Sequence, residues 1–504
     1  MRETALLLTA VLAGCAGAPG YRPPAVQVPP AFRESARPAA DTLTDGVGDD
    51  PLPENAGATA GGADAGGGGG GSAAADSAGA AVWRALGDTT LDRLVAELRR
   101  SNLDVRAAEA RIAGARAARL GSALDLAPTV TFAGGYTRQR LSSAAFPIGV
   151  GSFPDQSIWD AGFDAFWELD LFGRLRRNLQ AQGAFVGAAE EDLRDVRVTL
   201  TAELARAYFE LRGAEEQLAV ARRNADNQRR TFQVTRERLE AGRGTAFDTE
   251  RARAQLDLTL ASIPALEARV ADARYRIAVL VGRPPAAVAG ELEGDPGRLT
   301  LPDSIVVASP DSVIRRRPDV AAAERRLAAG RALVGAAKSD YLPRLTVGGG
   351  AGFAATDFDL LGDRGTFRYA VGPVVSWPLL NLGRVKAGVD AARAREAEAE
   401  AQYTQSVLRA LAEVETSLAR YRAGRARVER IGEAARASER AAELARLRFT
   451  SGVADFLQVL DAERTMLEAE DQLAQARTEA ATAYAALYKA LGGALPLAGP
   501  VDDR

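Results

Sequence analysis

The 504-residue chain balances 63 basic residues against 66 acidic ones, so its charge gives no support to nucleic-acid binding. It contains no histidine and one cysteine, which excludes most metal sites, histidine-based acid–base chemistry and an internal disulfide. The glycine runs lack the Lys-Ser/Thr that completes a phosphate-binding loop. Composition therefore argues against an enzyme, and we expect neither a cofactor nor a metal.

The N-terminus predicts export and lipidation. Residues 5–14 form an apolar run that is too short to cross a bilayer as a helix, which favours a signal peptide. The run ends in Leu12-Ala13-Gly14-Cys15, which resembles the processing box of bacterial lipoproteins. We therefore expect Cys15 to carry the lipid anchor. The alternative is a free cysteine behind a signal that is cut elsewhere.

The rest of the chain is internally duplicated. Eleven residues within 104–128 recur 215 positions later, within 319–343. Nine residues within 162–282 recur 210 positions later, within 372–492. Two copies of this size indicate a duplicated supersecondary unit rather than a short-period solenoid.

These observations divide the chain into six parts. They are the signal peptide (1–14), an N-terminal lipid-anchored segment (15–40), a low-complexity disordered linker in a Pro-, Asp- and Gly-rich tract (41–80), a first repeat (81–300), a second repeat (301–493) and a C-terminal tail (494–504).

Each repeat predicts the same order of elements. In the first copy we expect a helix from Asp88 to Leu126, strands over 129–140 and 157–170, a long helix from Gly173 to Ala241 and a return helix over 247–281. In the second copy we expect strands over 344–355 and 367–379, a long helix over 384–451 and a return helix to Leu491. The opening helix of each repeat and the return helix together match the long helix, which suggests that they stack end to end.

The strands alternate between apolar and polar side chains, as expected of a half-exposed sheet. The apolar positions that we expect to face lipid are Trp159, Phe163, Trp167, Tyr369 and Trp377. The acidic positions that we expect to face the lumen are Asp160, Asp164, Glu168 and Asp170. A soluble sheet remains an alternative for such a strand taken alone.

The predicted fold is an α+β membrane protein with two long coiled-coil hairpins and four amphipathic strands. No apolar run of 18 residues follows the signal, so a membrane crossing would require a β-barrel rather than helices. Because about eight strands are needed to close a small barrel, four strands predict an oligomer.

Several motifs, taken in order, closely resemble those of the TolC-like outer membrane efflux factors, in particular the lipid-anchored NodT-type branch. They are Tyr21-Arg22-Pro23-Pro24, Trp83 with Leu86-Gly87-Asp88, Trp167-Glu168-Leu169-Asp170-Leu171-Phe172-Gly173-Arg174, Arg316-Arg317-Pro318-Asp319-Val320, Arg448-Phe449-Thr450-Ser451-Gly452 and Leu460-Asp461-Ala462-Glu463-Arg464. The resemblance implies a homotrimer in outer membrane lipid. Its α/β barrel tunnel would extend into the periplasm and meet a periplasmic adaptor protein and an inner-membrane efflux pump.

The resemblance also implies roles for the hairpin tips, where Gly242 and Gly452 are expected to cap the long helices. The residues implied to contact the adaptor are Gly242, Thr245, Phe247, Asp248, Gly452, Val453, Asp455 and Phe456. The residues implied to close the periplasmic entrance are Leu457, Asp461 and Arg464. The alternative for Asp461 and Arg464 is an ordinary exposed ion pair.

We therefore predict a trimeric outer membrane channel that conducts small molecules from the periplasm to the exterior without a catalytic step. A periplasmic adaptor lipoprotein and a soluble structural coiled coil are the alternatives. An adaptor is the weaker match because it carries one hairpin, whereas this chain carries two.

Overall fold

A computed structural model describes residues 23–35, 82–83, 86–140, 154–292, 301–302, 305 and 307–494. Cys15, the 41–80 linker and the C-terminal tail beyond residue 494 lie outside these residues. The chain forms two compact units. The first contains the sheet with residues 109–192 and 321–406, and the second contains residues 27–108, 193–320 and 407–504.

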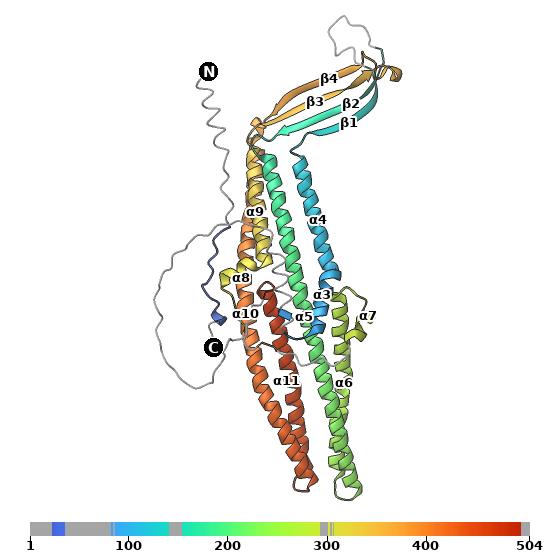
Figure 1. Cartoon of the computed structure of the whole chain (residues 1–504), viewed down its shortest axis with the longest axis vertical. Helices are drawn as coiled ribbons and strands as arrows, with labels where there is room; N and C mark the ends of the chain where they lie inside the picture. Colours follow the sequence, from blue (N-terminus) through green and yellow to red (C-terminus); the bar gives the residue numbers. More distant parts are fainter. Residues whose placement is uncertain are drawn as a thin grey trace, which may run out of the picture. The chain divides into compact units, whose positions relative to one another are not determined.

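The two copies contain matching elements (Figure 1). The first copy contains α3 (Thr89–Ser101), α4 (Leu103–Leu124), β1 (Thr129–Gln139), β2 (Gln156–Leu169), α5 (Arg174–Glu240) and α6 (Ala246–Leu280), followed by α7 (Pro285–Ala289) and η3 (Gly290–Leu292). The second copy contains α8 (Pro310–Arg316), α9 (Pro318–Ser339), β3 (Arg344–Ala355), η4 (Phe358–Leu360), β4 (Phe367–Ser376), η5 (Leu379–Asn381), α10 (Leu382–Thr450) and α11 (Phe456–Ala490). The short helix η1 (Arg33–Ser35) precedes both copies.

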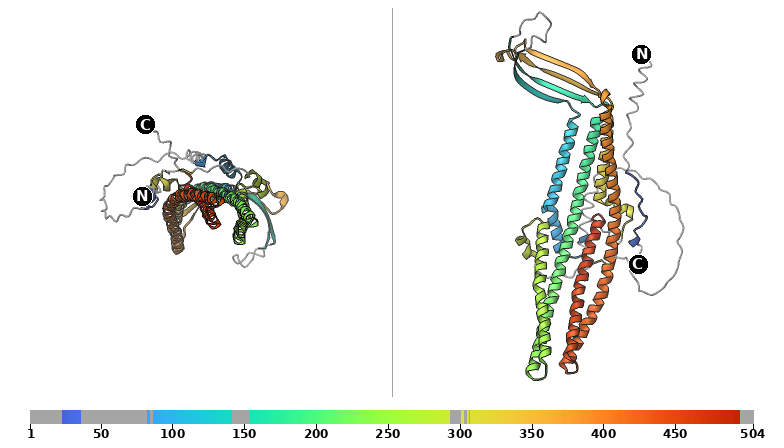
Figure 2. Two further views of the ribbon diagram at one scale, coloured as in Figure 1. Left: turned by 90° about the horizontal axis from the view of Figure 1, so that it is seen from below. Right: turned by 180° about the vertical axis from the view of Figure 1, so that it is seen from behind.

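The predicted strands, long helices and return helices are confirmed to within a few residues. In the second unit, α6 returns along α5 and α11 returns along α10, as Figure 1 and the right-hand view of Figure 2 show. The single helix predicted from Asp88 to Leu126 is wrong, because the chain breaks it at Asn102. The Asn102 backbone is extended, and its Oδ1 accepts hydrogen bonds from the Asp104 and Val105 N–H groups at 2.8 and 3.1 Å. One side chain thus ends α3 and starts α4.

The same break explains how the short helices meet the return helices. Asn102 Nδ2 donates to the Leu280 carbonyl at 2.8 Å, at the end of α6. In the second copy Arg317 lies at the break between α8 and α9, and its Nη1 donates to the Ala490 carbonyl at 2.9 Å, at the end of α11. Both bonds supply a partner to a helix-terminal carbonyl that has none within its own helix. The predicted end-to-end stacking is therefore confirmed, and it is built in the same way twice.

A glycine lets the first joint close. Gly282 has a φ of 72°, which favours glycine. A Cβ at this position would lie 2.5 Å from the Ser101 carbonyl oxygen. Larger residues would therefore push the end of α6 away from α3.

The main hydrophobic core belongs to the second unit and lies around Trp83. This side chain is fully buried and contacts Phe209, Tyr484 and Tyr488, with ring centroids between 4.8 and 6.4 Å apart. Phe32, in the N-terminal segment, is buried in the same core. The stretch that follows the predicted lipid anchor is thus attached to the helices by an aromatic side chain.

Candidate channel site: the sheet and the hairpin tips

The sheet has the order β1-β2-β3-β4, and its antiparallel register decides which side chains share a face. Phe132 lies opposite Phe163, with ring centroids 5.3 Å apart. Phe163 also lies opposite Ala351, which lies opposite Tyr369. One row of the sheet therefore carries aromatic side chains on three of its four strands, all on one face.

This parity holds along most of the sheet, with Arg138 and Ser157 on the apolar face and Ile158, Phe166 and Val374 on the other as the exceptions. The apolar face carries Val130, Phe132, Tyr136, Trp159, Phe163, Trp167, Val347, Phe353, Phe367, Tyr369, Val371 and Val375. The opposite face carries Thr129, Thr131, Thr137, Asp160, Asp164, Glu168, Thr346, Arg368 and Ser376, with glycines between them. The predicted separation of aromatic from acidic positions is confirmed for β2, whereas the medium that each face meets stays a prediction.

Glycines on the neighbouring strand make room for the β2 side chains on the polar face. A Cβ at Gly350 would lie 2.4 Å from Asp164 Oδ1, and a Cβ at Gly348 would lie 3.3 Å from the Phe166 ring. The glycine run in β3 is therefore a packing feature rather than a phosphate loop. Phe166 is 58% exposed on this face. The predicted acidic face did not include it, because it interrupts the series of acidic residues in β2.

The two acidic residues nearest the helices have local partners. Glu168 accepts from Arg174 Nη2 at 2.7 Å. The Asp170 carboxylate accepts from the Leu175 and Arg176 N–H groups at 3.0 and 2.9 Å, which caps the start of α5. Its side chain is only 8% exposed. Helix capping therefore occupies the Asp170 carboxylate, and its placement toward the lumen stays a prediction.

Two tryptophans tie the sheet to the helices that precede it. Trp167 Nε1 donates to the Leu126 carbonyl at 2.9 Å, and Trp377 Nε1 donates to the Tyr341 carbonyl at 3.1 Å. Trp377 follows β4 rather than lying within it. The two bonds are equivalent in the two copies, so each indole satisfies a carbonyl just past the end of a helix.

Among the described strands, β1 and β4 pair on one side only. Their outer edges present unpaired backbone N–H and C=O groups. Such edges favour pairing with another chain. The sheet is therefore suited to extension by further copies.

At the hairpin tips the predicted glycine caps are confirmed. Gly242 and Gly452 have φ values of 66° and 77°. In each case the next residue donates back to the end of the long helix, Arg243 to Arg238 at 2.8 Å and Val453 to Arg448 at 2.9 Å. Thr245 Oγ1 accepts from the Asp248 N–H at 3.2 Å and starts α6, while Asp455 takes the corresponding position before α11.

The tip residues differ in accessibility. Phe247 and Val453 are 63% and 70% exposed. Phe456 is 2% exposed and packs with Phe449, at 5.6 Å between ring centroids. The expectation that Phe456 contacts an adaptor is therefore wrong for this conformation, because the side chain fills a small core shared by the two hairpins. The period of the sequence could not show which tip aromatic faces inward.

The three candidate gate residues lie together on α11. Leu457 is 41% exposed. Arg464 Nη2 donates to Asp461 at 3.2 Å within the same helix, and both side chains are more than half exposed. A pair of this kind contributes little to stability, so these side chains are free to find other partners.

A buried polar seam, which was not predicted from the sequence, runs between α5 and α11. Its contacts on α5 fall seven residues apart. They join Gln217 to Asp471 at 2.7 Å, Asn224 to Glu470 at 3.2 Å and Thr231 to Glu463 at 3.2 Å. Seven-residue spacing is the repeat of a coiled-coil contact line, which normally carries apolar side chains. The polar residues at positions 217, 224 and 231, spaced by seven, are the feature of the sequence that could have predicted this seam.

At the lower end of the seam, Glu463 is 2% exposed and pairs with Arg446 Nε at 2.8 Å. Three residues here have buried side-chain atoms without a hydrogen-bond partner in the structure: Gln228, Arg446 at Nη2 and Glu463 at Oε2. Beyond the small apolar core around Phe456, the two hairpins therefore meet along this seam through polar contacts that water can replace.

The described helices include none with both the length and the hydrophobicity of a membrane-spanning helix. No cluster of three potential metal ligands occurs among the described residues either.

Comparison with known proteins decides the family. The model of the family described as "Outer membrane efflux protein" matches residues 94–283 and 309–493. The chain belongs to the outer membrane efflux protein family.

Known relatives and a solved structure match this chain along most of their length. The chain is 31% identical to the pyoverdine export outer membrane protein OpmQ of Pseudomonas putida, over 82% of this chain and 87% of that protein. It is 26% identical to nodulation protein T of Rhizobium leguminosarum bv. trifolii, over 97% of both chains. The solved structure of the outer-membrane channel OprN matches with a TM-score of 0.80 and 35% identity, over 95% of this chain and 99% of that one.

The predicted family, fold and location are therefore confirmed. The chain is an outer membrane efflux channel protein with an α/β fold of helical hairpins and a small antiparallel sheet. This membership favours the channel over the two alternatives, the adaptor and the structural coiled coil.

Proposed function

We propose that three copies of this chain assemble into a passive conduit that carries small molecules from the periplasm to the exterior without catalysing a reaction. The observation that carries the proposal is a four-stranded sheet with one continuous apolar face and two open edges. Two copies would supply eight strands, whose interior would be filled by side chains. Three copies supply twelve and leave space for water.

In this assembly the apolar face meets lipid and the polar face meets water. Phe163 and Tyr369 are 59% and 75% exposed in the single chain, which is costly in water and favourable in a bilayer. Asp160 and Asp164 then line the passage. Lipid at Cys15 adds a second attachment to the same membrane.

The hairpin tips supply the contact with a periplasmic adaptor, which links the conduit to an inner-membrane pump. Phe247 and Val453 are the exposed apolar side chains that support this role. Leu457, Asp461 and Arg464 of three copies close the entrance until a partner docks. Weak exposed pairs suit a closure that must be reversed.

The test compares two substitutions at neighbouring positions of β2. Arginine at a lipid-facing midplane site costs about 2–4 kcal/mol, so Phe163→Arg should reduce the heat-sensitive trimer on gels and the channels counted in planar bilayers. Asp164→Arg should assemble in normal amounts, because its side chain faces water. The reverse pattern would show that the faces are inverted, and full assembly of both variants would argue against membrane insertion of the sheet.

A further inference from the structure

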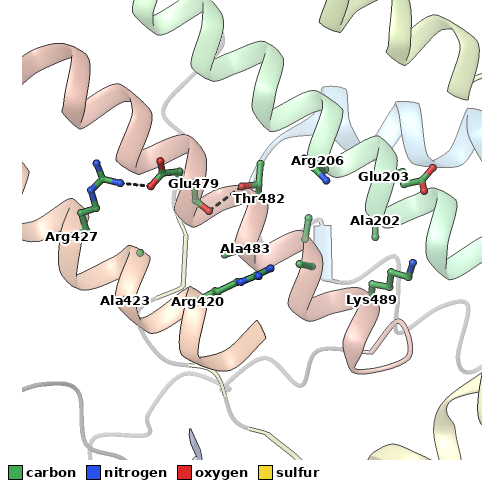
Figure 3. Close-up of a pocket in the computed structure, with 13 residues that line it drawn as sticks. Ala202, Glu203, Arg206, Arg420, Ala423, Arg427, Glu479, Thr482, Ala483 and Lys489 are labelled. Atoms are coloured by element: carbon green, nitrogen blue, oxygen red, sulfur yellow. Dashed lines mark hydrogen bonds and ion pairs between the residues drawn. The ribbon is translucent and has the colours of Figure 1, made fainter. Parts of the chain in front are cut away.

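A groove of about 640 Å³ in the second unit lies between α5, α10 and α11 (Figure 3). Small side chains form much of its lining, including Ala202 and Gly424. The space is therefore left by short residues at the meeting of three helices.

Charged side chains around this groove are predominantly basic. Its lining contains Arg206, Arg420, Arg427 and Lys489, against the carboxylates of Glu203 and Glu479. Figure 3 shows Arg427 joined to Glu479, and Arg206 Nε donates to Glu210 at 2.8 Å. Among the described residues, no carboxylate lies within 4.0 Å of the charged groups of Arg420 and Lys489. Two cations in the groove are thus not neutralised by a direct ion pair.

The groove opens on one particular side of α11. Tyr484 and Tyr488 on this helix contact Trp83 in the main core. Ala486 and Lys489 line the groove and, at 100° per residue, point largely away from that core. Because the Trp83 side is buried, the groove side is the one available to line a passage in the proposed trimer.

We propose that this groove binds anionic groups, such as phosphates or carboxylates, on solutes that pass through the conduit. Arg420 offers a planar fork of donors, and Lys489 offers a flexible point charge. Charges in a concave site attract counter-ions more strongly than charges on a flat surface. Three copies repeat the site around the passage. The position in the passage rests on the proposed function, whereas the anion binding does not.

The test is isothermal titration calorimetry of pyrophosphate into the detergent-solubilised full-length protein. The double variant Arg420→Gln with Lys489→Gln should bind roughly tenfold more weakly, since it loses two charges close to the anion. The matched control, Arg100→Gln with Arg106→Gln, removes two exposed arginines of α3 and α4 outside the groove and should bind like the wild type. Absence of wild-type binding, or equal binding by both double variants, would overturn the proposal.

Planar-bilayer recordings separate this proposal from the proposed function. If the wild type forms channels that pyrophosphate blocks, and the groove variant needs about tenfold more pyrophosphate, both hold. If channels form but no variant differs in block or in binding, the groove proposal fails and the conduit stands. If the calorimetric difference is found but no channels form, the conduit fails and the groove stands.

Discussion

Removing Arg446 should loosen the contact between the two hairpin tips. Arg446 Nε donates to Glu463 at 2.8 Å, and the Glu463 side chain is only 3% exposed. Arg446→Ala leaves that carboxylate buried. The Thr231 hydroxyl, at 3.2 Å, then remains as its hydrogen-bond donor. A buried charge that loses its partner favours any conformation in which water reaches it.

The expected loss of stability at the tip contact follows from how deeply each partner of the ion pair is buried. Breaking a buried ion pair by removing one member costs about 3–5 kcal/mol. Arg446 is itself 33% exposed, so water already screens part of the interaction. We therefore expect about 2–3 kcal/mol, which raises the local opening constant roughly 30- to 150-fold.

Hydrogen exchange with mass spectrometry on the detergent-solubilised protein measures this opening. Peptides that cover residues 225–240 and 456–470 should exchange faster in Arg446→Ala, whereas peptides from the Trp83 core should not change. Arg448→Ala is the matched control, because this arginine lies two residues away and is exposed. The combination of Arg446→Leu with Glu463→Leu should restore protection, since apolar replacement of a buried pair is often neutral or stabilising.

Equal exchange in Arg446→Ala and Arg448→Ala would refute the reasoning. It would mean that Glu463 is already solvated, or that the apolar cluster around Phe449 and Phe456 alone holds the tips together.

Three further predictions concern other parts of the chain. Asp461→Ala with Arg464→Ala should raise single-channel conductance in planar bilayers at unchanged trimer yield, and wild-type conductance in this variant would place the gate elsewhere. Cys15→Ser should abolish incorporation of labelled palmitate, and continued labelling would exclude Cys15 as the anchor. The Arg283 and Arg93 guanidinium groups lower the pKa of Glu291 from 4.5 to about 2. The ionised Glu291 side chain therefore contributes its full stabilisation above pH 4.5, and this stabilisation is lost as the pH falls toward 2. Hydrogen exchange of residues 285–292, corrected for intrinsic rates, should accelerate on acidification over this range in the wild type. Glu291→Gln should show no such dependence, and identical pH profiles would contradict the assignment.

Sequence period alone determined the elements and the faces of the sheet. Strand alternation separates Trp159 and Phe163 from Asp160 and Asp164 because successive side chains point to opposite faces. Gly242 and Gly452 predicted the positions of the hairpin tips, because each tip requires a residue with left-handed backbone after a long helix. The duplication predicted the paired helices, and the lengths of the helices predicted their end-to-end stacking. All of these are local or periodic properties, which the order of residues encodes directly.

Only the tertiary structure decided which polar and aromatic side chains are buried, and against what. Asn102 and Arg317 look like exposed polar residues in the sequence, yet each ends a helix and bonds to the last carbonyl of a distant one. Phe247 and Phe456 both follow a tip turn, but one is exposed and the other fills a core. Glu463 becomes a buried ion pair because α5 and α10 approach it from other parts of the chain. Burial depends on how separate helices pack, with partners as far as 232 residues apart in sequence, so no local pattern carries that information.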